Sequence, residues 1–158
     1  MNVSLVEIQA NTRAYDDLLL VAAQLDQARY IAVHEPYIDE SLLLGALVDG
    51  QCVGFLRLVI QVIGREHQRT PIIVAGAALR EGYVEAFGVV PAQRRLGIGQ
   101  RLQERAIELC RERKCYQIRS RSPITSVENY ALKLKLGYAI QPSHENDSYY
   151  FIKTLKQS

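Results

Sequence analysis

An apolar segment, a basic turn with two glycines and a long amphipathic segment follow one another between residues 83 and 113, and they constrain the fold more than any other feature. Tyr83 to Val89 predicts a strand, and the pattern that follows the turn, to about Arg113, predicts a helix. The start of such a helix presents free backbone N–H groups and a partial positive charge, which together suit a phosphate. The sequence therefore predicts an anion-binding site between a strand and a helix.

The glycine spacing separates this turn from two common phosphate-binding loops. A Walker loop ends in Gly-Lys followed by Ser or Thr, whereas Gly99 is followed by Gln100 and Arg101. A Rossmann fingerprint requires a third glycine where this chain has Leu102. Two glycines alone also fit an ordinary turn before a helix. A nucleotide or dinucleotide site is therefore an alternative that rests on the glycines alone.

Length and composition indicate one domain over residues 1–158. The apolar fraction is 48%, as in ordinary globular domains, and the net charge of +2 does not favour a nucleic-acid partner. We find no signal pattern and no apolar run long enough to span a membrane, so a cytoplasmic protein without a membrane partner is expected. The spacing of Cys52, Cys110 and Cys115 fits neither a zinc site nor a redox pair, so we expect reduced thiols and no metal.

Hydrophobic periodicity predicts a mixed sheet flanked by helices. The expected strands are residues 4–9, 42–48, 52–63, 83–89, 116–119, 138–140 and 149–154, and the expected helices are residues 15–30, the segment after the glycine turn, and 127–136. We expect Asn11-Thr12 near a helix start, Asp49-Gly50 in a hairpin, residues 71–79 in an extended continuation or edge strand, and residues 80–82 and 143–147 in turns. The strand–helix–strand order after residue 83 implies parallel strands.

Two segments resemble the GNAT superfamily of N-acetyltransferases. The stretch from Arg94 to Gly99 resembles its Arg/Gln-x-x-Gly-x-Gly/Ala signature, and Val89-x-Pro91 precedes it as in the family. Residues 129–138, which end in Gly-Tyr, resemble the family's late helix and its closing Gly-Phe/Tyr. The resemblance is strong over residues 83–138. It implies an α+β fold with a twisted, mostly antiparallel sheet of six to seven strands, and a central strand–helix–strand unit that binds acetyl-CoA.

The resemblance also implies an enzyme, an acetyl-CoA-dependent N-acetyltransferase in which a primary amine attacks directly in a ternary complex. The pyrophosphate of acetyl-CoA is expected on backbone N–H groups of residues 94–100, and its pantetheine arm along residues 87–90, where an N–H near Val89 polarises the thioester carbonyl. Asn129 is expected to hydrogen-bond the arm, with solvation at a helix start as its alternative. The predicted cofactor-binding residues are Phe87, Gly88, Val89, Arg94, Arg95, Leu96, Gly97, Ile98, Gly99, Gln100 and Asn129.

The acceptor amine must lose a proton before it attacks, and Glu85 is the predicted base. Strand alternation predicts that Glu85 shares a face with Tyr83 and Phe87, where partial burial raises a carboxyl pKa. The alternative is an exposed strand residue paired with an arginine. In the family, a tyrosine usually protonates the leaving thiolate, but this chain has Lys133 at that position. Tyr130, about one helical turn earlier, is predicted to substitute, and packing against the sheet is its alternative role.

The missing tyrosine motivates a second hypothesis, a non-catalytic acyl-CoA-binding or regulatory module on the same fold. If the chain is an enzyme, its acceptor is expected to be a small-molecule or peptide amine. By resemblance, the acceptor pocket is built from residues 30–39, 64–70 and 143–149. Acidic residues in these segments suit a cationic amine, although acids in loops are usually only solvated: they are Glu35, Asp39, Glu145 and Asp147. The sequence leaves a homodimer open.

Overall fold

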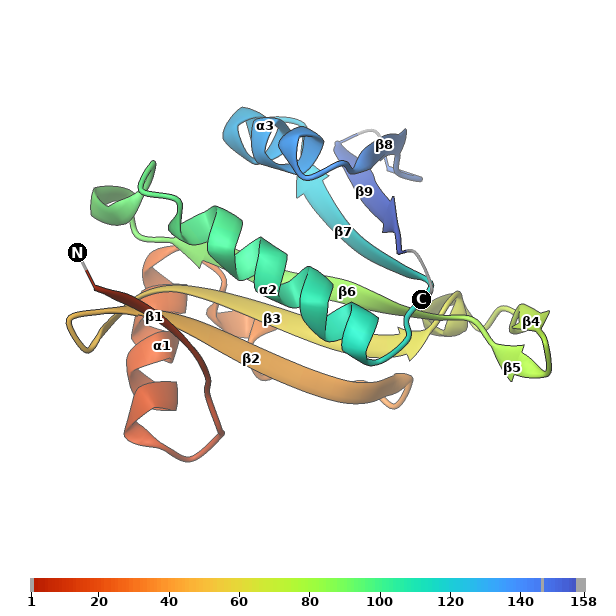
Figure 1. Ribbon diagram of the computed structural model, residues 1–158, viewed down its shortest axis with the longest axis horizontal. Helices are drawn as coiled ribbons and strands as arrows, with labels where there is room; N and C mark the ends of the chain where they lie inside the picture. The colour runs from red at the N-terminus through yellow and green to blue at the C-terminus, as the bar shows by residue number, and fades with distance from the viewer. Residues whose placement is uncertain (1, 146, 156–158) are drawn as a thin grey trace.

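A seven-stranded mixed sheet forms the centre of the computed structural model, which describes residues 2–145 and 147–155 (Figure 1). In pairing order its strands are β1 (Val3–Glu7), β2 (Ile38–Val48), β3 (Gln51–Val62), β6 (Arg80–Val89), β7 (Gln117–Pro123), β9 (Ser148–Thr154) and β8 (Ala139–Pro142). Strands β6 and β7 pair in parallel, and the other neighbours pair antiparallel. The predicted α+β fold with a mostly antiparallel sheet is confirmed.

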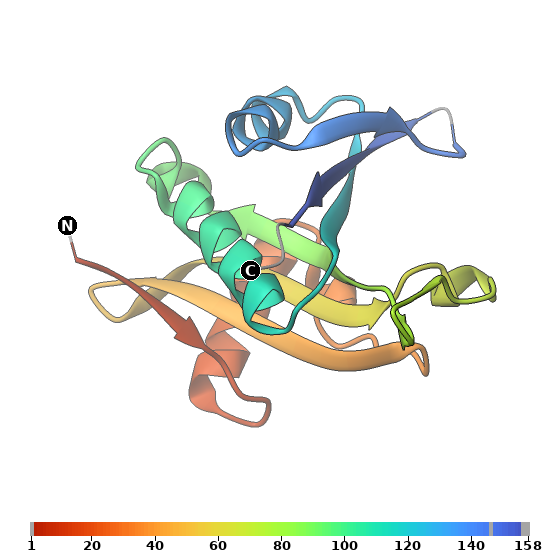
Figure 2. The same cartoon turned by 45° about the vertical axis from the view of Figure 1, so that its right-hand side comes forward.

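Helices cover both faces of this sheet and divide the core into two parts (Figures 1 and 2). Helix α1 (Arg13–Gln24) packs on one face around the fully buried Phe55, and helix α2 (Ile98–Glu112) packs on the other face around Leu56 and Leu58. Helix α3 (Val127–Lys135) lies on the α2 side, beside β7 and β8. No helix within residues 2–145 and 147–155 is long and apolar enough to cross a membrane.

Helix α1 ends earlier than its apolar pattern predicted. Thr12 is the N-cap and accepts a hydrogen bond from the N–H of Tyr15 at 3.2 Å, as the Asn11-Thr12 pair suggested. The helix stops at Gln24 because Asp26 adopts a left-handed conformation with a φ of 57°, which breaks the helical hydrogen-bond ladder. A short 3₁₀ turn, η1 (Ala28–Tyr30), follows. The prediction of one helix over residues 15–30 is therefore wrong at its C-terminal end.

The long hairpin in the first half of the chain follows its turn signal. Strands β2 and β3 are joined by Asp49 and Gly50, whose φ angles are 49° and 81°. Two consecutive positive φ values are typical of the turn whose twist matches the flanking strands. The predicted hairpin is confirmed, and β2 begins four residues earlier than expected, at Ile38.

Two segments between β3 and β7 differ from their prediction. Residues 80–82 were expected in a turn, but they begin β6, and Glu81 is fully buried there. Residues 71–79 do not extend the main sheet. They form a separate two-stranded hairpin of β4 (Ile73–Val74) and β5 (Ala77–Ala78), because Ala75 and Gly76 between them adopt positive φ angles.

Strands β6 and β7 separate along their length, and this separation positions the site. They pair from Glu81↔Gln117 to Val84↔Ser120, and the recorded pairing ends there. Beyond that point β6 continues to Val89 and leads through a 3₁₀ turn, η3 (Pro91–Gln93), into α2. The glycine turn therefore lies at the end of β6 that β7 leaves unpaired.

Candidate active site

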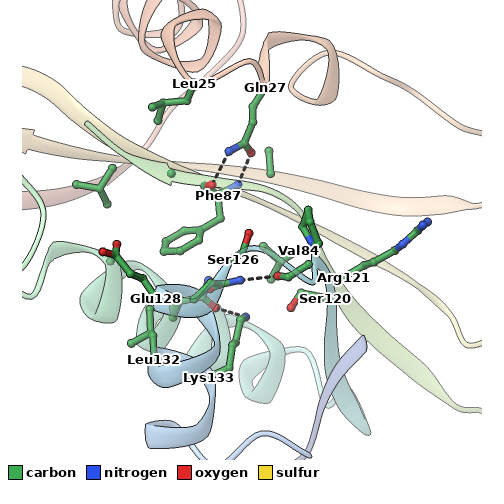
Figure 3. A pocket seen from close by; sticks show the side chains of 18 of the residues that line it. Leu25, Gln27, Val84, Phe87, Ser120, Arg121, Ser126, Glu128, Leu132 and Lys133 are labelled. Carbon is green, nitrogen blue, oxygen red and sulfur yellow. Dashed lines mark hydrogen bonds between the residues drawn. The ribbon is translucent and has the colours of Figure 1, made fainter. Parts of the chain in front are cut away.

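A cleft of about 1270 Å³ opens where β6 and β7 separate, bordered by the start of α2 and by α3 (Figure 3). Ten of the predicted site residues line it: Glu85, Phe87, Gly88, Val89, Arg94, Arg95, Gly97, Gly99, Gln100 and Asn129. The side chains of three other predicted residues lie elsewhere. Leu96 is half-exposed, Ile98 is 1% exposed in the core, and the Tyr130 hydroxyl donates to the Pro123 carbonyl at 2.7 Å.

The glycine turn leaves the start of α2 open to a ligand. Gly97 is the N-cap of α2 and supplies no side-chain cap. The Arg101 N–H donates to the Gly97 carbonyl at 3.1 Å, so the N–H groups of residues 98–100 precede the first intrahelical hydrogen bond. Arg94 lies beside this turn, and its Nε donates to the Val89 carbonyl at 2.9 Å. The turn thus offers backbone donors and positive charge to an anion.

The two glycines of this turn have different physical roles. Gly97 has a φ of 79°, which L side chains rarely adopt, and no atom lies within 4 Å of where its Cβ would be. Gly99 is helical, and a Cβ there would lie 3.1 Å from Cζ of Phe87. Gly97 therefore permits the turn, whereas Gly99 permits the close contact between α2 and β6.

The edge of β6 that faces the cleft is partly occupied by Gln27, a residue that sequence reasoning missed. Its Nε2 donates to the Phe87 carbonyl at 2.8 Å, and its Oε1 accepts from the Phe87 N–H at 3.0 Å (Figure 3). The Val90 N–H donates to the Val53 carbonyl of β3 at 2.8 Å. Backbone groups alternate between the two edges of a strand, so the Val89 N–H points toward the cleft.

Glu85 lies in a β-bulge. The register with β3 passes from Arg57↔Ala86 to Leu58↔Val84 and leaves Glu85 without a direct partner. Val84 packs in the core on the α2 side and Ala86 in the core on the α1 side, so the bulge reverses the alternation. Phe87 packs against the α2-side core. The prediction that Glu85 and Phe87 share a face is therefore wrong.

The surroundings of Glu85 raise the pKa of its carboxyl. Partial burial raises the pKa of the Glu85 carboxyl above its usual range, Arg57 acts in the opposite direction, and Glu66 and Glu35 add to the rise. Arg57 is only 3% exposed and donates to the Tyr30 carbonyl at 2.8 Å. Glu85 is thus a desolvated carboxyl beside a fixed arginine, which suits a group that accepts and returns protons.

A buried ion-pair cluster supports this part of the sheet. Arg119 donates twice to Glu81, from Nε at 3.0 Å and from Nη2 at 2.9 Å, and its Nη2 also lies 2.6 Å from Glu66. Burial pushes the pKa of Glu81 upward, but the hydrogen bonds and charge of Arg119 hold it below its ordinary value. The Arg119 guanidinium also lies 4.6 Å from the centroid of the Tyr83 ring, which lines the cleft. The cluster therefore fixes the strand segment that precedes Glu85.

Most acids of the expected acceptor segments are paired with arginines. Asp39 lies 2.9 Å from Arg65, and Arg121 pairs with Glu145 and lies 3.5 Å from Asp147. Residue 146 of the last segment lies outside the described residues. Glu35 is different, because it acts on the pKa of both Glu85 and Tyr37. Glu35 therefore adds negative potential at Glu85, whereas Glu145 and Asp147 of the last hairpin lie beside Arg121.

Three buried polar atoms on the cleft wall have no hydrogen-bond partner among residues 2–145 and 147–155. They are Oδ1 of Asn129, Oγ of Ser120 and Nε2 of Gln103. The Asn129 Nδ2 donates to Ser122 on β7, so the amide is fixed with its oxygen unpaired. Buried polar groups without partners are uncommon in proteins and point to an absent ligand or water. Within the same residues, no group of three or more His, Cys, Asp or Glu side chains is arranged to hold a metal.

Comparison with known sequences gives one family. The sequence profile of the acetyltransferase (GNAT) family matches residues 10–134. No curated protein matches the chain significantly.

Solved structures share the fold over nearly the whole chain. Arabidopsis thaliana NAA60 in complex with a bisubstrate analogue is 12% identical with a TM-score of 0.74, covering 99% of this chain and 100% of that one. The GNAT domain of S. lividans PAT is 19% identical with a TM-score of 0.70, covering 97% and 90%. The PaiA N-acetyltransferase from Thermoplasma acidophilum in complex with coenzyme A is 14% identical with a TM-score of 0.68, covering 98% and 100%.

Proposed function

Because the chain belongs to the acetyltransferase (GNAT) family, we propose that it transfers the acetyl group of acetyl-CoA to a primary amine while both are bound in the cleft between β6 and β7. One observation carries this proposal. The same cleft joins the uncapped start of α2 to the desolvated carboxyl of Glu85. An anion site and a proton acceptor on one cavity are what a phosphate-bearing acyl donor and an amine acceptor require.

The residues of the cleft fit acetyl-CoA. The pyrophosphate would be held by the backbone N–H groups that begin α2, with Arg94 beside them. The unpaired Oδ1 of Asn129 and Oγ of Ser120 would serve the amide groups of the pantetheine arm. The solved structures of NAA60 and PaiA, which hold a bisubstrate analogue and coenzyme A, support this ligand class for the fold. When bound, acetyl-CoA supplies an acetyl thioester that amines can attack.

The protein's own groups have separable roles in the proposed reaction. Glu85 accepts a proton from the protonated acceptor amine, directly or through water, because an amine with a pKa of about 10 is mostly charged at neutral pH. Glu35 adds negative potential near Glu85 that favours a cationic acceptor, from a small molecule or a peptide. The Val89 N–H, fixed toward the cleft, donates a hydrogen bond to the carbonyl oxygen under attack.

A Gly99→Val substitution is expected to weaken acetyl-CoA binding by at least about tenfold, which corresponds to about 1.4 kcal/mol. A Cβ at position 99 would lie 3.1 Å from Cζ of Phe87, so either the ring or the start of α2 must move. Isothermal titration calorimetry with acetyl-CoA measures the effect. Arg111→Val is the control, since it places the same side chain at an exposed position near the other end of α2. Equal dissociation constants for both variants would exclude the start of α2 as the anion site.

The experiment that tests the function is an assay of thiol release from acetyl-CoA over a panel of primary amines, with mass spectrometry of the amines. We expect amine-dependent thiol release and an amine product heavier by one acetyl group. A second function, a non-catalytic acyl-CoA-binding module, is favoured by the absence of a tyrosine at position 133. Tight acetyl-CoA binding without release by any amine would support that module instead.

A further inference from the structure

Lys133 is a buried lysine on the wall of the cleft whose recorded contacts are neutral. It is 1% exposed, its Nζ donates to Gln103 Oε1 at 2.8 Å, and it lies 4.3 Å from the centroid of the Tyr138 ring. It takes part in none of the ion pairs found in residues 2–145 and 147–155. Buried lysines are normally paired with an acid. This lysine therefore needs an explanation other than an internal salt bridge.

The hydrogen bonds around Lys133 are incomplete on the side of the cleft. An ammonium group can only donate, so Gln103 must present its oxygen to Lys133 and its Nε2 elsewhere. That Nε2 has no partner among the described residues, and neither has the Ser120 hydroxyl on β7. In Figure 3, Lys133 projects from α3 toward the strands that carry Ser120 and Val84. An ammonium with three donors and one recorded acceptor thus lies on a cleft wall that also carries unpaired polar atoms.

Burial makes Lys133 an unusually strong acid for a lysine. It lowers the pKa of the ammonium group to about 7. The titratable group recorded against it is the Tyr138 hydroxyl, whose pKa is raised by burial. The Cys110 thiol of α2, whose pKa is raised by its contact with Cys115, acts in turn on Tyr138. A free thiol has a pKa of about 8.5, so an ammonium with a pKa of about 7 can protonate a thiolate favourably. An ordinary lysine, at about 10.4, cannot.

We propose that Lys133, in its ammonium form, donates a proton to the sulfur that leaves during acyl transfer. The inference rests on the proposed function. As the N–C bond of the product amide forms and the C–S bond breaks, the sulfur keeps the bonding electron pair and takes a proton from Nζ. Glu85 first takes one proton from the protonated amine and releases it to solvent, and it takes the second nitrogen proton as the N–C bond forms. Lys133 is then neutral and Glu85 is protonated, and exchange of one proton each with solvent restores both groups.

The positions of Glu85 and Lys133 suit a proton acceptor and a separate proton donor. Glu85 lies in the bulge of β6, on the side of Arg57, whereas Lys133 comes from α3, on the α2 side of the sheet. Glu85 therefore accepts the amine proton on the β6 wall of the cleft, and Lys133 donates a proton to the sulfur from the α3 wall. Tyr130, the other candidate donor, is not among the residues that line the cleft, and its hydroxyl already donates to the Pro123 carbonyl.

The first test needs no turnover. Lysines are labelled with ¹³C at Cε, and their NMR shifts are followed from pH 5 to about 11 in the protein without ligand. The Lys133 signal, identified by its loss in Lys133→Met, is expected to titrate near pH 7. Titration above about 9.5, in the ordinary lysine range, would overturn the proposal.

The second test uses turnover. Lys133→Met is expected to lower kcat by about 10²-fold or more while the dissociation constant of acetyl-CoA changes less than about threefold. The wild-type kcat should fall above about pH 7 as Lys133 deprotonates, and the variant should lack this alkaline decline, which a structural role alone would not remove. Lys135→Met, the same change at an exposed position of α3, is the control and should leave kcat unchanged. An unchanged pH profile in Lys133→Met, or acetylation of Lys133 itself during turnover, would contradict a proton donor.

Failure of the inference and failure of the proposed function are distinguishable. If no amine releases thiol from acetyl-CoA, the function fails, while the lysine titration still tests whether Lys133 is acidic enough to be the donor. If the wild type turns over and Lys133→Met equals it at every pH, the function stands and the inference is wrong.

Discussion

Replacement of Glu85 by glutamine is expected to lower kcat by about 10²- to 10⁴-fold and to leave acetyl-CoA affinity within about threefold of the wild type. Glutamine keeps the size and hydrogen-bonding capacity of the side chain but cannot accept the amine proton. The bulge that carries residue 85 is set by the register with β3, so the backbone should not change. Steady-state kinetics with the best amine of the panel, together with calorimetry of acetyl-CoA, separates the two effects.

The pH dependence gives Glu85 a second signature. Burial raises the pKa of Glu85, and a base must be deprotonated to act, so wild-type kcat should rise with pH through a midpoint above the ordinary carboxyl value of about 4.3. Glu85→Gln should lack this acidic limb. Glu7→Gln, the same change on the exposed edge strand β1, should retain both the limb and the rate. Unchanged turnover in Glu85→Gln would remove Glu85 as the base.

Replacement of Arg119 by methionine is expected to lower the free energy of unfolding by about 3–5 kcal/mol, because it leaves Glu81 as an unpaired charge in the core. Urea unfolding at neutral pH measures the loss. The double variant Arg119→Met with Glu81→Gln is the control, since it removes the buried charge with its partner, and it should recover at least about half of the stability. A double variant as unstable as the single one would contradict this account.

The contribution of the Arg119–Glu81 pair to the free energy of unfolding should change with pH in a predictable direction. In the wild type the folded-state pKa of Glu81 lies below its unfolded-state value. Glu81 therefore adds to the free energy of unfolding above the unfolded-state pKa, and this stabilisation is lost as the pH falls through the folded-state pKa. In Arg119→Met, burial without a partner raises the pKa of Glu81 instead. The cost of burying the unpaired Glu81 charge then lowers the free energy of unfolding at high pH, and this cost disappears as the carboxyl becomes protonated. The stability difference between wild type and Arg119→Met should therefore shrink as the pH falls.

Short sequence motifs were sufficient to predict the elements whose conformation depends on a few adjacent residues. The hairpin at Asp49-Gly50, the helix start at Thr12 and the glycine turn before α2 follow from backbone conformational preferences of a few adjacent residues. The position of the cleft also followed, because parallel strands joined through a helix were expected where β6 and β7 lie. Ten of the predicted site residues consequently line one cavity.

The features that the sequence did not reveal depend on partners far along the chain. Arg80-Glu81-Gly82 looks like a turn, and Glu81 can enter a strand only because Arg119 of β7 compensates its buried charge. The bulge at Glu85 is a mismatch between two strands and has no signal in either one. Gln27 reaches Phe87 because α1 stops early. The acidity of Lys133 arises from burial against α2, which no motif encodes.

The central claim is that this cleft joins acetyl-CoA to a primary amine, and amine-dependent thiol release tests it most directly. Wild type and Gly99→Val are compared with acetyl-CoA and each amine of the panel, and the products are identified by mass. The account predicts that at least one amine is acetylated with stoichiometric thiol release, and that Gly99→Val loses this activity at acetyl-CoA concentrations that sustain the wild type. Acetyl-CoA binding without release by any amine, or equal release by Gly99→Val, would contradict it.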